Sequence, residues 1–373
     1  MRFADVIDHT DTKQQLLRMV ANDRLPHALL VVGPEGSGAL PLALGLARYL
    51  LCTDRTPDDA CGVCAGCRKT GKYAHPDLHF SFPTVGTNVR SDQYLPEWRA
   101  ALTENPYLNV QQWLQRIGAE NKQGNINKEE CNAILKKISL KTFEGKHKVL
   151  VLWMAEYLGE EGNRLLKLIE EPPPDTVFLF VAESAEQILN TILSRCQLVK
   201  LHALTDQTIA ATLEAKGYVK GARAQTLAFL AGGSYNEALT LLESAELNHS
   251  EAFVTWLRLV YKGSPLKLVD WVNAFAKAYG REAQKQFLQY GLIFLREMLV
   301  LSVRGRVAVR LPEAELATAE KINQILAFDQ LAQLSDWLSD AAYHIERNAH
   351  PKVLFLDLSI RTHRLLKRRP TAA

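Results

Sequence analysis

A glycine-rich turn at residues 33–40 has the frame of a phosphate-binding loop but lacks its reactive side chains. It reads Gly-Pro-Glu-Gly-Ser-Gly-Ala-Leu. A P-loop, G-x-x-x-x-G-K-[ST], holds phosphate with backbone amides, reaches the terminal phosphates with its lysine and ligates magnesium with its hydroxyl. Ala39 and Leu40 replace the lysine and the hydroxyl residue. The turn predicts a degenerate P-loop framed by Gly33, Gly36 and Gly38, which does not hydrolyse ATP; nucleotide binding stays open.

A second loss appears at the end of the apolar run 148–153. A nucleoside triphosphatase needs acidic residues there, to hold magnesium and orient water. Trp153 and Met154 stand in those places, and Glu156 comes too late in the sequence to replace them. Both halves of the expected active site have therefore lost their chemistry.

Four of the six cysteines fall within sixteen residues, as Cys52, Cys61, Cys64 and Cys67. Closely spaced Cys-x2-Cys pairs let one loop surround a zinc ion with four thiolates. Such a site has no open coordination position, so the predicted zinc is structural rather than catalytic.

Ser194-Arg195-Cys196 offers one further reactive group. Arg195 has two interpretations that sequence spacing does not separate. It is either an ordinary surface salt-bridge partner or an arginine finger, a planar cation that stabilises transition-state charge on a neighbour's triphosphate.

The length and composition indicate a globular protein of several domains. The chain has 373 residues, 47% hydrophobic and 23% charged, with a net charge of +3, and single cores stop growing near ~250–300 residues. The acidic start, with Asp5, Asp8 and Asp11, does not fit a signal peptide, and Arg296 and Glu297 interrupt the most apolar stretch. We therefore expect a cytoplasmic protein without a membrane span.

The first 200 residues alternate between strand and helix patterns. Continuous apolar runs at 28–32, 148–153 and 177–181 predict strands buried on both faces. Helical spacing follows each run, at 40–51, 160–171 and up to about 194. This alternation predicts an α/β domain with a parallel sheet. Residues 84–125 are polar and turn-rich, and resemble an insertion in this domain.

Beyond residue 202 the strand signals fade and helical patterns take over. Short helices are expected at 206–216, 222–231 and 236–246, followed by long amphipathic ones at 266–278, 282–303, 314–326 and 330–348. We expect three domains: 1–203, a helical 204–247 and an all-α 248–373.

Several motifs together resemble the bacterial clamp-loader subunits of the AAA+ class. They are residues 25–30 (Leu-Pro-His-Ala-Leu-Leu), the four-cysteine insertion, 75–77 (His-Pro-Asp), 163–173 (Asn-Arg-Leu-Leu-Lys-Leu-Ile-Glu-Glu-Pro-Pro) and 192–196 (Ile-Leu-Ser-Arg-Cys). The degenerate P-loop resembles the delta-prime group of these subunits rather than the ATP-hydrolysing gamma/tau group. The likeness covers residues 1 to about 245 and is looser beyond.

The resemblance implies a RecA-like AAA+ domain, a small helical lid and a C-terminal collar within a five-subunit ring. Such a ring contains gamma/tau and delta subunits, opens the sliding clamp and places it on primed DNA. A delta-prime subunit is a stator without hydrolysis of its own. Arg195 would then face the ATP of the adjacent gamma/tau subunit, and the four cysteines would ligate zinc.

The chain departs from this family in the lid as well. Asn236 stands where ATP-binding relatives carry a nucleotide-sensing arginine. Two other interpretations stay open: a gamma/tau-like ATPase with a degenerate P-loop, and a zinc-dependent DNA-binding module with Arg68, Lys69 and Lys72 beside the cysteines. The basic tail at 361–369 is either a solvated terminus or a contact to DNA or an acidic partner.

Overall fold

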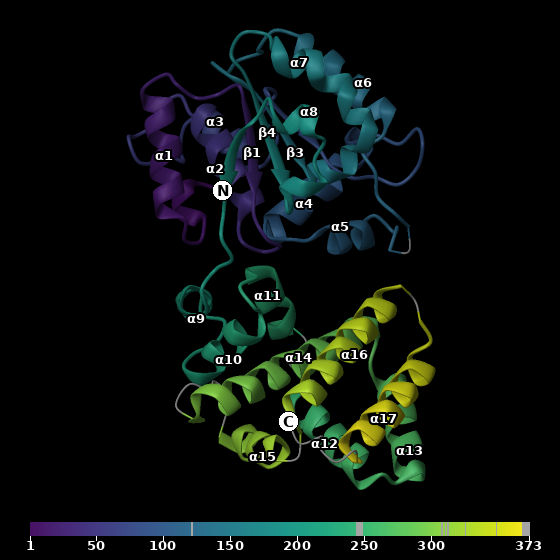
Figure 1. Cartoon of the computed structure of the whole chain (residues 1–373). Coiled ribbons are helices and arrows are strands. Elements are labelled where there is room, and N and C mark those ends of the chain that lie inside the picture. The colour runs from purple at the N-terminus through teal and green to yellow at the C-terminus, as the bar shows by residue number, and fades with distance from the viewer. Residues whose placement is uncertain are drawn as a thin grey trace. The chain divides into compact units, whose positions relative to one another are not determined.

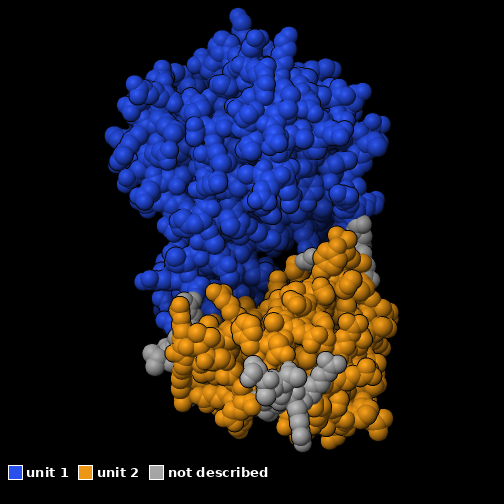
Figure 2. Space-filling view, viewed as in Figure 1, with its two compact units in different colours: residues 1–241 blue, residues 242–373 orange. Residues whose placement is uncertain are grey.

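The chain forms two compact units in a computed structural model, residues 1–241 and 242–373 (Figure 2). The structure describes residues 1–120, 122–243, 249–306, 309, 311, 313–324, 326–347 and 349–367. The expected boundary at 247–248, the end of the helix expected at 236–246, and Arg368 and Arg369 of the basic tail lie outside these residues. The three-domain division of the sequence stays a prediction.

The first unit is built on a five-stranded parallel sheet with the strand order β2-β3-β4-β1-β5 (Figure 1). This confirms the expected α/β class. The strands are β1 (Ala28–Val32), β2 (Leu78–Ser81), β3 (Lys148–Trp153), β4 (Thr176–Ala182) and β5 (Gln197–Lys200). The sequence analysis missed β2 and β5. Both are edge strands of four residues, too short for an apolar run to identify.

Helices cover both faces of this sheet, and alternate strand residues contact opposite layers. Leu29 and Val31 belong to one apolar cluster, with α1, α2, α4 and α5, whereas Ala28 and Leu30 belong to the other, with α6, η3, α7 and α8. The helical segments are η1 (Phe3–Asp5), α1 (Thr10–Ala21), α2 (Ala39–Leu50), α3 (Ala65–Gly71), η2 (Ser91–Tyr94), α4 (Leu95–Glu104), α5 (Val110–Arg116), α6 (Lys128–Ser139), η3 (Ala155–Leu165), α7 (Leu166–Glu170), η4 (Ala185–Gln187) and α8 (Asn190–Leu193).

The helices expected at 160–171 and up to about 194 are wrong in type and length. A 3-10 segment, η3, occupies the first half of the first, and only the five residues of α7 are α-helical. Gly159, with φ 48° and ψ −144°, interrupts the helical backbone within η3. The second is divided between η4 and the four residues of α8. Apolar spacing does not separate these short turns from a continuous helix.

The described residues of the polar segment at 84–125 form an integral part of the first unit. It carries α4 and α5, whose side chains Trp98 and Trp113 are both fully buried against the sheet. The ring of Trp98 stacks on Phe82 with centroids 4.4 Å apart, and Trp113 donates a 2.8 Å hydrogen bond to the carbonyl of Pro83. Two buried indoles contribute several kcal/mol each, so this insertion is fastened to the core.

Three short helices follow the sheet within the first unit: α9 (Asp206–Ala215), α10 (Ala222–Leu230) and α11 (Tyr235–Glu243). Thr205 caps α9 by accepting a hydrogen bond from the amide of Thr208. The buried residues Ile209, Leu213 and Ala224 line the shared side of α9 and α10. We refer to α9–α11 as the lid helices.

The second unit is helical, as expected, and its core is aromatic. Phe253, Phe287, Phe294 and Phe355 are all fully buried, and Phe287 lies within 6 Å of two of these rings. The helices are α12 (His249–Lys262), α13 (Pro265–Ala278), α14 (Arg281–Arg304), α15 (Glu313–Asn323), α16 (Phe328–Glu346) and α17 (Pro351–Lys367). One segment, residues 283–304 of α14, has the length and hydropathy of a membrane span, but its apolar window is half buried inside the protein, as in a core helix.

Candidate functional site

The glycine-rich turn lies at the carboxyl end of β1 and leads directly into α2 (Figure 1). Gly38 precedes the helix with φ +109°, a conformation that favours glycine. This is the place of a P-loop in a parallel α/β sheet. The cavity beside the turn has a volume of only 30 Å³. That volume has room for only one or two water molecules, whereas ligand pockets measure about 300–1,000 Å³.

The lid helices close the turn from one side. The amide of Tyr235, at the start of α11, donates a 3.1 Å hydrogen bond to the carbonyl of Gly36. A Cβ atom on Gly36 would lie 2.0 Å from Oγ of Ser234, so glycine is required for this approach. The backbone of the turn is thus in direct contact with the lid.

Tyr107, from the 84–125 segment, closes the other side. Its ring would lie 3.3 Å from a Cβ atom on Gly38, and its hydroxyl accepts a 2.9 Å hydrogen bond from the amide of Ile7. It also meets the ring of Tyr235 edge-on, with centroids 5.0 Å apart. Tyr107 is 4% exposed, so it fills space next to the turn.

Carboxylates, rather than cations, surround the remaining cavity. Glu35 and Glu183 both line it. Desolvation of its carboxyl, followed by the nearby charges of Glu35 and Glu156, raises the pKa of Glu183 to about 7. A site in which a carboxyl group is already hard to ionise also disfavours the negative charges of a triphosphate. Ala39, Leu40, Trp153 and Met154 also line the cavity and supply no charge.

The four cysteine side chains converge at the end of α2 and the start of α3. All four Sγ atoms lie within 4.8 Å of one another, and three of the pairs are 3.5, 3.8 and 3.9 Å apart. A tetrahedral zinc site with Zn–S bonds of about 2.3 Å places its sulfurs about 3.8 Å apart. Backbone amides also donate to Sγ of Cys61 and Cys64, each at 3.3 Å. The donor set and its spacing therefore fit zinc.

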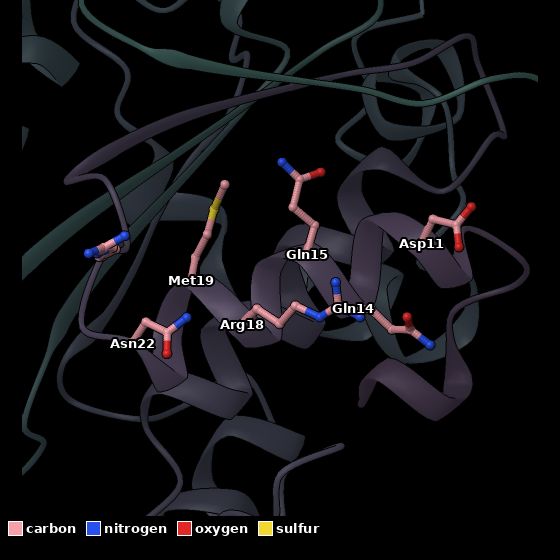
Figure 3. A pocket seen from close by; sticks show the side chains of 7 residues that line it. Asp11, Gln14, Gln15, Arg18, Met19 and Asn22 are labelled. Atoms are coloured by element: carbon pink, nitrogen blue, oxygen red, sulfur yellow. The ribbon is translucent and has the colours of Figure 1, made fainter.

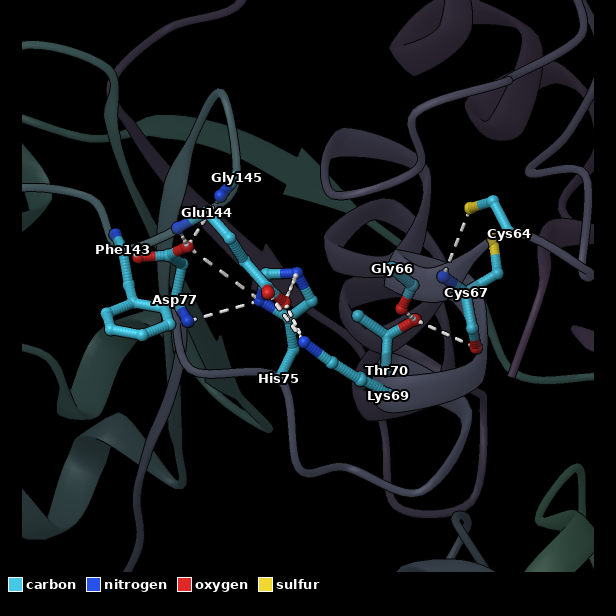
Figure 4. A network of polar contacts seen from close by, with 10 residues as sticks. All are labelled: Cys64, Gly66, Cys67, Lys69, Thr70, His75, Asp77, Phe143, Glu144 and Gly145. Atoms are coloured by element: carbon cyan, nitrogen blue, oxygen red, sulfur yellow. Dashed lines mark hydrogen bonds and ion pairs between the residues drawn. The ribbon is translucent and has the colours of Figure 1, made fainter.

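A polar network joins this cysteine module to the sheet (Figure 4). The carboxylate of Asp77 accepts hydrogen bonds from the amides of Phe143, Glu144 and Gly145 at 2.5–2.9 Å. Burial alone would raise the pKa of Asp77, but these amides outweigh it and lower the pKa. Lys69 of α3 donates a 2.7 Å hydrogen bond to Glu144.

His75 completes the network in Figure 4 from the buried side. Its Nδ1 accepts a 3.1 Å hydrogen bond from the amide of Asp77, which leaves the proton on Nε2, 3.3 Å from the carboxylate of Glu144. Burial lowers the pKa of His75 despite the two neighbouring carboxylates. The network therefore holds a neutral imidazole and acts as a structural connection.

Arg195 lies after α8, with its side chain 34% exposed. Its Nε donates a 2.5 Å hydrogen bond to Glu170 of α7, and its NH1 group donates to the carbonyl of Thr191 at 2.7 Å. Glu170 thus orients the guanidinium at the surface. In the isolated chain, Arg195 and Glu170 therefore form a surface salt bridge. No residue of the glycine turn takes part in it.

A separate hollow of 470 Å³ lies along α1 (Figure 3). It is lined by Asp11, Gln14, Gln15, Arg18, Met19, Asn22 and Arg24. None of these seven side chains belongs to the cysteine cluster or to the glycine turn. We assign no chemistry to this hollow.

Sequence reasoning identified the turn, the cysteines and Arg195, but missed the residues that fill the turn. Tyr107 and its polar neighbours Asn105 and Asn109 come from the segment that looked like an unplaced insertion. Asn236 was noted only as a lost arginine. The signal was weak, because nothing in a tyrosine or an asparagine by itself predicts a contact with a site about seventy residues away.

The chain is similar to several known proteins in sequence and in structure. Residues 8–205, more than half of the chain, match the family model described as "DNA polymerase III, delta subunit". The chain is 27% identical to DNA polymerase III subunit delta' of Haemophilus influenzae, over 67% of this chain and 69% of that protein. It is 26% identical to subunit delta' of Bacillus subtilis, over 52% of this chain and 47% of that protein. A solved structure of a gamma subunit-related protein from Thermotoga maritima aligns with 96% of this chain and all of that one, with a TM-score of 0.47 and 14% identity.

Proposed function

Because the chain belongs to the DNA polymerase III delta-prime family of clamp-loader subunits, we propose that it is a non-catalytic stator of a clamp loader. In this role it assembles with gamma/tau and delta subunits in the cytoplasm. The complex places the sliding clamp on primed DNA, and this chain contributes no ATP hydrolysis of its own.

The filled glycine turn is the observation that carries this proposal. Hydrolysis needs a triphosphate, a lysine, magnesium ligands and a positioned water. The turn has a 30 Å³ cavity lined by Glu35 and Glu183, and it has alanine and leucine in the places of the lysine and the hydroxyl residue. The same features argue against the gamma/tau-like ATPase, since an ATPase requires both the space and the charge.

We assign Arg195 the role of an arginine finger for a neighbouring subunit. Its guanidinium is at the surface, and an arginine has five N–H donors in a planar fork that matches phosphate oxygens. The exposed pair with Glu170 costs little to break, because such pairs contribute about 0–1 kcal/mol. Glu170 would therefore hold the side chain in position until a neighbour's triphosphate replaces it.

The four cysteines are proposed to hold one structural zinc ion, with Cys52, Cys61, Cys64 and Cys67 as its ligands. Four thiolates leave no open coordination position, so the ion would stabilise the 52–67 loop and activate no water. We find no contact of this module that favours the DNA-binding alternative over the structural one.

Reconstitution tests the proposal. The chain is mixed with gamma/tau and delta subunits of the same organism, and ATPase activity is measured with primed DNA and clamp. We expect no turnover by the chain alone, and a decrease of roughly 10-fold or more in the complex containing Arg195→Ala. Arg164→Ala is the matched control, because Arg164 is a similarly exposed arginine paired with Glu161.

Two outcomes would contradict this assignment. Turnover of ATP by the isolated chain would overturn the non-catalytic role. An Arg195→Ala complex that assembles normally and hydrolyses ATP at the rate of the Arg164→Ala complex would remove the finger. Gel filtration of each complex separates a loss of assembly from a loss of catalysis.

A further inference from the structure

The residues from Asn105 to Asn109 do more than fill space beside the glycine turn. Their side chains form a chain of polar contacts that reaches both the turn and the lid. Nδ2 of Asn105 donates a 2.7 Å hydrogen bond to Asn236 of α11, and Nδ2 of Asn109 donates a 2.9 Å hydrogen bond to Glu35 of the turn. Asn236 in turn lies 3.4 Å from the same carboxylate oxygen of Glu35.

These groups are held firmly in place. Asn236 is 1% exposed, and the Oδ1 atom of Asn105 accepts a 2.9 Å hydrogen bond from the amide of Tyr107. Asn109 caps α5 by accepting from the amide of Gln112. Asn105 and Asn109 therefore each bind a nearby backbone amide and a distant element at once, which fixes their rotamers.

An apolar contact accompanies the polar one. Tyr107 lies between Gly38 of the turn and Tyr235 of the lid. With Pro106 it also lines a cleft of 820 Å³ between the first residues of the chain and the helices α9 and α11. The two residues therefore form part of the wall between that cleft and the 30 Å³ cavity. The turn is thus separated from the larger space.

We propose that residues 105–109, here termed the plug, take the place of a nucleotide in joining the glycine turn to the lid helices. In an enzyme that closes a lid, the bound ligand makes contacts to both sides and so determines the closed state. Here the chain's own side chains make those contacts. The lid of this subunit is therefore closed at all times and does not respond to ATP.

This inference goes beyond the proposed function, since a subunit without hydrolysis could still bind ATP or carry a mobile lid. It predicts a preorganised subunit, whose first unit presents one conformation to its neighbours in every state of the complex. Preorganisation lowers the entropic cost of association.

Amide hydrogen exchange of the isolated full chain tests the plug. In the wild type we expect α11 to exchange slowly, with no change on addition of ATP and Mg²⁺. In Asn105→Ala/Tyr107→Ala we expect the amides of residues 235–241 to exchange about 10-fold faster or more, while those of β1 and β4 stay protected. Tyr73→Ala is the matched control, because Tyr73 is a buried tyrosine of the same unit that contacts neither the turn nor the lid.

The result that overturns the proposal is α11 exchange in the double variant no faster than in Tyr73→Ala. A wild-type lid that exchanges quickly and is slowed by ATP and Mg²⁺ would overturn it as well. If the double variant does not fold, Asn105→Ala and Asn236→Ala, singly and combined, provide a double-mutant cycle. Coupled effects on α11 exchange support the plug, and additive effects contradict it. None of these readouts depends on Arg195, so failure here is distinct from failure of the finger.

Discussion

At the scale of single residues, three separate features oppose nucleotide binding at the glycine turn. Ala39 and Leu40 remove the charge and the hydroxyl that a P-loop needs. Tyr107 occupies the space, and Glu35 with Glu183 adds negative charge. The three features are missing side chains, occupied space and negative charge. They are independent, so reversing one of them leaves the other two.

Restoring the lysine and hydroxyl residues of the P-loop should therefore not restore nucleotide binding. We expect Ala39→Lys/Leu40→Thr to show no more affinity for ATP and Mg²⁺ than the wild type in isothermal titration, because Tyr107 still fills the site. Adding Tyr107→Ala to this variant should raise the affinity above that of either. Tight binding by the repaired loop with Tyr107 in place would show that the missing side chains alone, and not the filled volume, exclude nucleotide.

A partly buried histidine makes the stability depend on pH. Burial, followed by the charges of Lys137 and Lys148, lowers the pKa of His79 in β2 to about 4. The unfolded chain binds this proton near pH 6.5, so the stabilisation is complete above that pH and is lost as the pH falls from about 6.5 towards 4. The slope is up to about 1.4 kcal/mol per pH unit.

Urea denaturation between pH 7 and pH 5 measures this contribution. The free energy of unfolding of the wild type should decrease across the interval, and His79→Gln, which cannot take up the proton, should show a smaller decrease. An identical slope in the two proteins would mean that other groups account for the pH dependence.

At the scale of elements, short segments held by side-chain contacts surround a regular sheet. The cysteine module has only the seven residues of α3 as regular structure. It depends on the cysteine cluster at one end and on the contacts of Lys69, His75 and Asp77 at the other. A loop of this kind has little core of its own, so a bound ion contributes directly to its folding.

Removal of zinc should loosen this module and leave the sheet folded. We expect the purified chain to contain about one zinc ion and Cys61→Ala to contain far less, with faster proteolysis within residues 53–66 and an unchanged far-ultraviolet circular dichroism spectrum. Cys131→Ala is the control, because Cys131 is buried in α6 outside the cluster. Equal zinc content in Cys61→Ala and the wild type would contradict the proposed ligand set.

At the scale of the whole molecule, each compact unit has its own core. The first centres on the parallel sheet with Trp98 and Trp113, and the second centres on the rings of Phe253 and Phe287. A unit with a separate core is able to unfold separately.

Calorimetry should therefore resolve two transitions. Phe287→Ala removes a buried ring from the second unit and should destabilise only one transition, by about 3–5 kcal/mol. Trp98→Ala should shift only the other, and serves as its reciprocal control. A single transition that moves as a whole in both variants would show that the two units unfold together.

The sequence alone was enough for features that depend on residue type and short spacing. Parallel strands follow from continuous apolar runs, the cysteine cluster from Cys-x2-Cys spacing, and the missing lysine and hydroxyl of the P-loop from Ala39 and Leu40. These signals are local, because the chemistry requires particular atoms at neighbouring positions. The edge strands β2 and β5 escaped because four residues carry too little periodicity.

Only the tertiary structure decided what occupies the glycine turn. The contacts of Asn105 with Asn236 and of Asn109 with Glu35 join residues 131 and 74 positions apart. Such pairs arise from how α4 and α5 pack on the sheet and how α11 contacts the glycine turn, and no local pattern encodes that packing. The missing P-loop side chains were therefore readable from the sequence, whereas the contacts that join the turn to α11 required the fold.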